Sequence, residues 1–77
     1  MKSNYSMLIQ WSDEDKIFVV TIPEFEGRLM MPCTHGDSYA DAVQAGQEVI
    51  ETFLEIWTEE GRSIPQPRFI RLLSELM

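Results

Sequence analysis

The sequence of 77 residues predicts an α+β domain with the element order β-β-β-α-β, in which one long amphipathic helix packs on a small antiparallel sheet. Residues 5–11 alternate apolar and polar side chains, which is typical of a half-buried strand. Residues 39–60 instead place apolar side chains every three or four positions, which is typical of a helix with one buried face. A chain this short has room for one core, so we expect residues 1–77 to form a single domain.

The first two strands are expected to form an antiparallel hairpin. The apolar side chains that share one face of residues 5–11 are Tyr5, Met7, Ile9 and Trp11. Residues 16–22 are rich in β-branched and aromatic side chains and end at Pro23, which cannot donate to a central ladder. The polar residues 12–15 favour a turn, because Asp and Ser side chains hydrogen-bond the neighbouring backbone. A third, shorter strand is predicted at residues 28–31.

The clearest boundary signals surround the helix predicted at residues 39–60. Ser38 is a suitable N-cap, Asp41 stands three residues later as in a variant capping box, and Gly61 suits the position beyond the last turn. The outward face carries a stripe made up of Asp41, Gln44, Glu48, Glu51, Glu55 and Glu59. No lysine or arginine lies in this helix, so its like charges repel one another at i,i+4 without compensation.

The chain beyond Gly61 is expected to be extended and then helical. Pro65 and Pro67 fix their own φ and disfavour helix in the residue before them, so residues 62–67 are predicted to be extended and to add a short edge strand. Apolar spacing in residues 68–77 predicts a short C-terminal helix, which needs a packing partner to form. The apolar residues that either complete the core or form an oligomer interface are Leu29, Met31, Phe69, Leu72, Leu73 and Leu76.

The charge of the chain excludes one class of function and favours another. Thirteen acidic and six basic residues give a formal net charge of −7 at pH 7. Such a chain repels a phosphate backbone, so we expect no direct binding of nucleic acid, whereas a basic protein suits it as a partner. The single cysteine and the lack of a signal-peptide core or of an apolar stretch of about 20 residues predict a cytoplasmic protein that does not enter the membrane.

Two groups of side chains have a catalytic interpretation and a simpler one. Cys33 and His35 could supply a nucleophile with its base or part of a metal site, or they could be a buried thiol beside a loop histidine. The carboxylates that could hold Mg²⁺ for phosphodiester cleavage, or could equally be solvated turn residues, are Asp13, Asp15, Glu24 and Glu26. A magnesium site needs carboxylates that converge from separate strands, so we expect no enzymatic activity, no cofactor and no metal.

Several short motifs follow one another in a defined order. They are Tyr5 at the start of the first strand, the acidic turn at 13–15, Ile22-Pro23 after the second strand, Gly36-Asp37-Ser38 before the helix, and residues 60–67 after it. Each motif is common, but their order and spacing together resemble the HicB-like antitoxin family over residues 4–67. The turn lacks the glycine that is frequent after the acidic residues in this family, which predicts a different turn geometry.

The resemblance implies a fold often likened to a degenerate ribonuclease H fold, and the function of the antitoxin in a type II toxin–antitoxin pair. Such an antitoxin binds a small basic HicA-like toxin that cleaves RNA, and covers its catalytic histidine or its RNA-binding surface. Charge and fold analogy together select as partner-binding residues Glu24, Glu26, Glu48, Glu51 and Glu55. The chain ends ten residues after Pro67, so we expect the N-terminal domain of the family without its C-terminal DNA-binding module. The alternative is an orphan oligomeric adaptor or structural domain that has no toxin partner.

Overall fold

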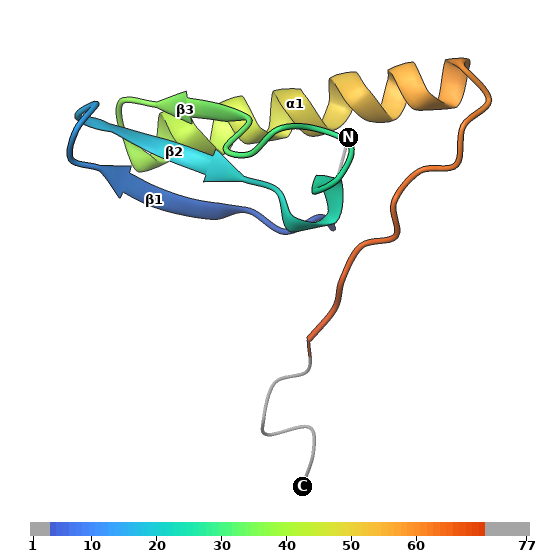
Figure 1. Cartoon of the computed structure of the whole chain (residues 1–77), viewed down its shortest axis with the longest axis horizontal. Helices are drawn as coiled ribbons and strands as arrows, with labels where there is room; N and C mark the ends of the chain where they lie inside the picture. Colours follow the sequence, from blue (N-terminus) through green and yellow to red (C-terminus); the bar gives the residue numbers. More distant parts are fainter. Residues whose placement is uncertain (1–3, 71–77) are drawn as a thin grey trace, which may run out of the picture.

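A three-stranded sheet is covered on one face by a long helix in the computed structural model, which describes residues 4–70 (Figure 1). The elements are β1 (Leu8–Ser12), β2 (Ile17–Thr21), the 3-10 turn η1 (Pro23–Phe25), β3 (Thr34–Gly36) and α1 (Tyr39–Glu59). The strands lie in the order β1-β2-β3, and both pairings are antiparallel. The α+β class, the hairpin and the single long helix are therefore confirmed.

The hairpin is antiparallel, as predicted, and its register brings together the apolar faces of the two strands. Ile9 lies opposite Val20, and Trp11 lies opposite Phe18, so these four side chains share the face that turns toward α1. The turn closes with a hydrogen bond of 2.7 Å from the Lys16 amide to the Ser12 carbonyl. Lys16 has a φ of 58°, the left-handed conformation that glycine adopts at least cost. A lysine therefore occupies the conformation for which a glycine is the ordinary choice.

The third strand lies further along the chain than the prediction at residues 28–31. β3 (Thr34–Gly36) pairs with β2, and the Cys33 amide extends the pairing with a hydrogen bond of 3.0 Å to the Val20 carbonyl. The loop before β3 makes only an isolated bridge between Glu26 and Leu29. Leu29 and Met31 are half-buried against the core, so their hydrophobicity reflects packing rather than strand pairing.

The core lies between the sheet and α1. Its buried hydrophobic side chains, each at most 3% exposed, are Val20, Ile22, Phe25, Ala42, Ile50 and Trp57. Phe25 of η1 packs edge to face on Trp57, with ring centroids 4.9 Å apart. The 3-10 turn therefore covers the C-terminal half of α1, which extends beyond the strands in Figure 1.

Both ends of α1 agree with the predicted boundary signals. The Asp41 amide donates to the Ser38 side chain at 3.1 Å, which confirms the N-cap. Gly61 has a φ of 74° and its amide donates to the Thr58 carbonyl, as expected for the residue that ends a helix. At the start of α1 a Cβ on Gly36 would collide with the backbone of Asp41 and Ala42, so only glycine lets β3 and the helix approach this closely.

The segment after Gly61 differs from the prediction. Residues 62–70 are extended, but they do not pair as a strand with the sheet. Pro65 and Pro67 lack the amide hydrogens that a ladder needs, and the segment is held by separate side-chain contacts instead. The Tyr5 hydroxyl donates to the Pro65 carbonyl at 2.6 Å, and Arg28 donates to the Ser63 carbonyl at 2.7 Å. Residues 68–70 of the predicted C-terminal helix are not helical, and residues 71–77 lie outside the described part.

Glu24 connects the two ends of the described chain. The residue is 6% exposed, and its carboxylate accepts hydrogen bonds from the Ser6 amide at 3.1 Å, the Ser6 hydroxyl at 3.0 Å and the Arg68 amide at 2.9 Å. Burial acts to raise the pKa of Glu24, but the hydrogen bonds from Arg68, Ser6 and its own backbone outweigh burial and hold the pKa below the ordinary 4.5. The ionised carboxylate therefore stabilises the fold.

Gly36→Ala is predicted to destabilise the protein by at least about 2 kcal/mol, because the new Cβ would overlap backbone atoms that cannot move independently. Gly46→Ala is the matched control. There the Cβ would meet two side chains rather than backbone, the flexible Met7 and Cγ1 of the buried Val20 at 3.3 Å, and alanine gains about 1 kcal/mol of helix propensity over glycine. Chemical denaturation should find a smaller loss of stability in this control than in Gly36→Ala. Equal losses in the two variants would contradict the close approach at Gly36.

Glu24→Gln is predicted to lower the free energy of unfolding by about 1–3 kcal/mol at neutral pH, because the amide presents donors to the donors of Ser6 and Arg68. A carboxyl group with a depressed pKa contributes stability that is fully present above its unfolded pKa and is lost as the pH falls through its folded pKa. The difference between parent and variant should therefore stay constant above the ordinary pKa of 4.5 and shrink as the pH falls below it. The exposed neighbour Glu26→Gln serves as the control, and a difference that does not vary with pH would refute this role of Glu24.

Candidate protein-binding surface

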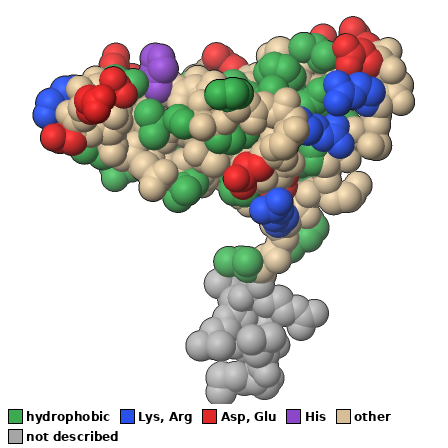
Figure 2. Space-filling view, viewed as in Figure 1, with side chains coloured by type: hydrophobic (Ala, Val, Ile, Leu, Met, Phe, Trp, Pro, Cys, Tyr) green, Lys and Arg blue, Asp and Glu red, His purple; other side chains and the backbone are tan. Residues whose placement is uncertain are grey.

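The outward face of α1 carries a row of glutamates. Glu48, Glu51 and Glu55 are all exposed and follow one another at helical spacing, on the side opposite the buried residues Ile50 and Trp57. The last turn contains no basic residue, although a cation is favoured there by the helix dipole. Figure 2 shows acidic side chains at several points along the edge of the molecule where α1 runs. We call Glu48, Glu51 and Glu55 the acidic face.

A hollow of about 460 Å³ adjoins the acidic face. It is lined by Glu51, Leu54, Glu55, Thr58 and Glu59. Leu54, which is half-buried, is the apolar residue of this lining, and three of the other four residues are glutamates. Lysine and arginine side chains combine an aliphatic stem with a charged end, so a basic side chain is complementary to this arrangement.

The glutamates predicted before α1 have two different environments. Glu26 is exposed in the loop after η1. Glu24 is buried, and its carboxylate is occupied by Ser6 and Arg68. The structure thus brings Glu48, Glu51 and Glu55 together on α1, whereas Glu24 serves the interior of the fold. The sequence alone could not separate Glu24 from Glu26, because its hydrogen-bond partners are distant in the chain.

The apolar residues predicted for an oligomer interface are also divided. Leu29 and Met31 are half-buried against the core. Phe69 is 76% exposed, and its neighbour Ile70 is 96% exposed. The predicted interface residues Leu72, Leu73 and Leu76 lie outside the described residues.

Cys33 and His35 do not form a site together in the described structure. His35 is exposed on β3, opposite Val19. Cys33 is half-buried, its thiol donates to the Val20 carbonyl at 3.6 Å, and burial raises the pKa of the thiol. Within residues 4–70, no three His, Cys, Asp or Glu side chains are grouped so that they could hold a metal ion.

An exposed cluster of aromatic rings lies at the hairpin end of the sheet. Phe18 of β2 packs edge to face on Trp11 of β1, with centroids 5.1 Å apart, and its ring lies 4.3 Å from that of Tyr39, the first residue of α1. We call these three residues the aromatic patch. Trp11 and Phe18 lie opposite each other because of the hairpin register. The contact of Phe18 with Tyr39 depends instead on where β3 ends and α1 begins.

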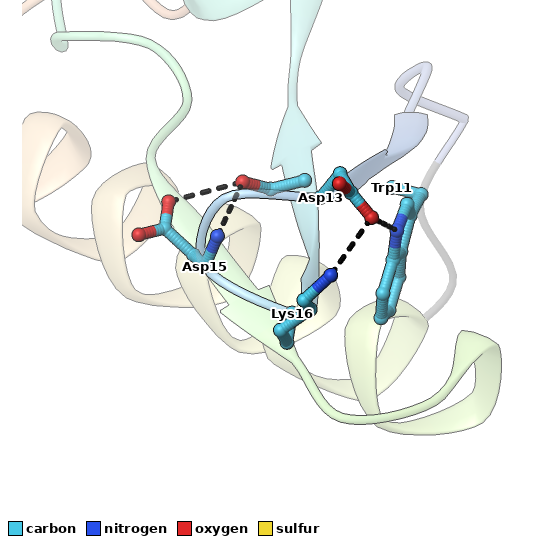
Figure 3. Close-up of polar contacts among 5 residues, drawn as sticks. Trp11, Asp13, Asp15 and Lys16 are labelled. Carbon is cyan, nitrogen blue, oxygen red and sulfur yellow. Dashed lines mark hydrogen bonds and ion pairs between the residues drawn. The ribbon is translucent and has the colours of Figure 1, made fainter.

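A single turn places the charges beside the aromatic patch. Asp13 accepts hydrogen bonds from the indole Nε1 of Trp11 at 3.4 Å and from Nζ of Lys16 at 3.0 Å (Figure 3). Asp15 accepts a hydrogen bond of 3.0 Å from the Ser12 hydroxyl. Asp13 and Asp15, two of the four carboxylates considered as possible magnesium ligands, thus have hydrogen-bond partners within the turn.

Comparison with known proteins identifies the family. No helix in the described part of the chain has the length and apolar character that a membrane span requires. No curated protein and no solved structure matches the chain. A family model described as the HicB-like antitoxin of bacterial toxin–antitoxin system matches residues 5–76. This match extends past Pro67 into the tail and covers nearly the whole sequence, so the chain belongs to the HicB-like antitoxin family.

Proposed function

We propose that the protein binds and occludes a small basic HicA-like toxin that cleaves RNA in the cytoplasm. The observation that supports this most directly is the acidic face of α1, whose glutamates are exposed and lack any basic neighbour within the helix. Membership of an antitoxin family makes a toxin the expected partner. A toxin that binds RNA needs a basic surface, and a cluster of carboxylates is complementary to such a surface.

The acidic face is suited to rapid association with a basic protein. Like charges at i,i+4, such as Glu51 and Glu55, destabilise a helix by about 0.2–0.5 kcal/mol per pair. A cationic partner relieves this repulsion when it binds. The free energy by which the repulsion destabilises the free helix then favours formation of the complex. Charge complementarity of this kind raises the association rate more than it raises affinity. Leu54 in the lining of the hollow offers an apolar contact at the same surface.

We propose occlusion rather than catalysis as the means of inhibition. The carboxylates that a magnesium-dependent nuclease would need to bring together are dispersed in the described structure. Asp13 and Asp15 lie in the hairpin turn with partners of their own, and Glu24 is used inside the fold. The protein then acts by covering the toxin and leaves RNA cleavage to its partner.

We further propose that the tail forms a subunit interface. Phe69 and Ile70 are the last described residues, and both expose most of their apolar surface in the single chain. A domain of 77 residues has a small core, so burying such side chains between copies would stabilise it. The interface would continue through Leu72, Leu73 and Leu76.

The function is tested by expressing the chain together with the small basic protein encoded beside it. We expect the two proteins to purify as a complex, and the isolated partner to cleave RNA until this chain is added. A partner whose RNA cleavage is unaffected by an excess of this chain would contradict the proposal and favour the orphan adaptor. RNA cleavage by this chain alone would contradict occlusion.

Glu51→Gln combined with Glu55→Gln is predicted to slow association with the basic partner by about three- to tenfold at low salt, because it removes the centre of the acidic face. Glu14→Gln combined with Asp37→Asn changes the net charge equally at the hairpin end of the molecule and controls for long-range attraction. Association rates of the two double variants are compared by stopped-flow or surface-based measurements. Equal slowing in both double variants would show that net charge, not the acidic face, drives association.

Truncation after Arg68 is predicted to reduce the oligomeric mass and to remove the concentration dependence of the melting temperature, because it deletes the apolar tail. Arg68 is retained so that its amide still reaches Glu24. Light scattering and thermal denaturation at several protein concentrations measure the outcome. A truncated protein with the parent's mass and melting behaviour would exclude the tail as an interface.

A further inference from the structure

The aromatic patch has the composition and exposure of a protein contact. Trp11 is 50% exposed and Tyr39 is 66% exposed, although each ring packs on Phe18. The three rings come from β1, β2 and α1, so their positions are fixed by the sheet and by the start of the helix. Tryptophan and tyrosine held in place before binding contribute strongly to interfaces, because little conformational entropy is lost when they are covered.

The charges beside the patch indicate what kind of group covers it. The Asp13 carboxylate lies at the edge of the Trp11 ring, held by the indole and by Lys16 (Figure 3). The hydrogen bond from Lys16, and then that from Trp11, lower the pKa of Asp13, so this carboxylate is ionised at neutral pH. Glu14 and Asp15 are exposed in the same turn. An aromatic surface edged by carboxylates is complementary to a cation.

We propose that the aromatic patch and Asp13 form a docking site for an arginine side chain of a basic partner protein, with the guanidinium stacked on Trp11 and paired with Asp13. The inference rests on the proposed function only for the identity of that partner. Arginine suits the site better than lysine, because its planar guanidinium stacks on aromatic rings and meets a carboxylate with two parallel hydrogen bonds. A second copy placed patch against patch suits it poorly, since each copy would bring the exposed carboxylates of the same turn.

Lys16 occupies the position that the arginine would take. Its ammonium lies 3.0 Å from the Asp13 carboxylate, and the two side chains are 68% and 85% exposed. Exposed pairs of this kind are weak, so an arriving guanidinium that also gains the stacking contact displaces the ammonium. Lys16 and Asp13 must therefore have opposite effects on binding: loss of the carboxylate weakens it, and loss of the ammonium strengthens it.

The test is a calorimetric titration with hexaarginine and hexalysine peptides at low ionic strength. The parent protein should bind hexaarginine about two- to fivefold more tightly than hexalysine, and Trp11→Ala should abolish this preference. Asp13→Asn should weaken hexaarginine binding by about fivefold, whereas the matched control Glu14→Gln should change it by less than about twofold. Lys16→Gln should strengthen it by about two- to fivefold. Hexaarginine should also shield Trp11 from acrylamide quenching of its fluorescence.

Several results would overturn the inference. They are equal affinities of the parent for the two peptides, weaker hexaarginine binding by Lys16→Gln, and a fall in the solution mass of Trp11→Ala, which would assign the patch to a second copy. Asp13→Asn and Lys16→Gln alter exposed turn residues, so they decide the matter even if Trp11→Ala does not fold.

The RNA-cleavage assay separates this inference from the proposed function. If the parent protects RNA and the Trp11→Ala and Asp13→Asn variants protect it equally well, the docking site is refuted and the antitoxin function stands. If the parent binds hexaarginine with the expected preference but does not protect RNA, the antitoxin function fails and the docking site stands.

Discussion

The close approach of β3 to the first turn of α1 is the contact on which the rest of the structure depends. Gly36 lets the strand backbone meet the backbone of Asp41 and Ala42 directly, with no side chain between them. This contact fixes where α1 begins and how it is rotated about its axis. The rotation in turn buries Ile50 and Trp57 against the sheet, leaves the acidic face in solvent and sets Tyr39 on Phe18.

The carboxylates of this acidic protein have two distinct uses. Glu24 is enclosed by hydrogen-bond donors and stabilises the fold from within. The glutamates of the acidic face remain exposed, and Glu48 accepts a hydrogen bond of 3.4 Å from the side chain of Gln44 rather than from the backbone. Their mutual repulsion disfavours the free helix. The same residue type therefore supports structure at one site and is available for recognition at the other, and the number of neighbouring amide donors makes the difference.

Local patterns in the sequence predicted the structural features that depend on residues close together in the chain. Alternation in residues 5–11 and the signals at Ser38 and Gly61 located the hairpin and both ends of α1 correctly. The third strand was misplaced because the apolar run at residues 29–31 packs on the core, whereas the short β3 carries little hydrophobic signal of its own. The acidic face could be predicted from helical spacing. The burial of Glu24 and the gathering of the aromatic patch could not, because both need contacts between residues far apart in the chain.

The protonation of Glu24 affects two segments that are far apart in the chain. Its carboxylate binds the segment that leads into β1 through Ser6 and the segment that leaves α1 through Arg68. Protonation weakens this acceptor for both segments at once, so a pH below the ordinary carboxyl pKa of 4.5 would loosen the two segments together. The apolar residues Phe69 and Ile70 directly follow Arg68, whose amide binds Glu24. Protonation of Glu24 would therefore also loosen the part of the chain that is proposed to join one copy to another.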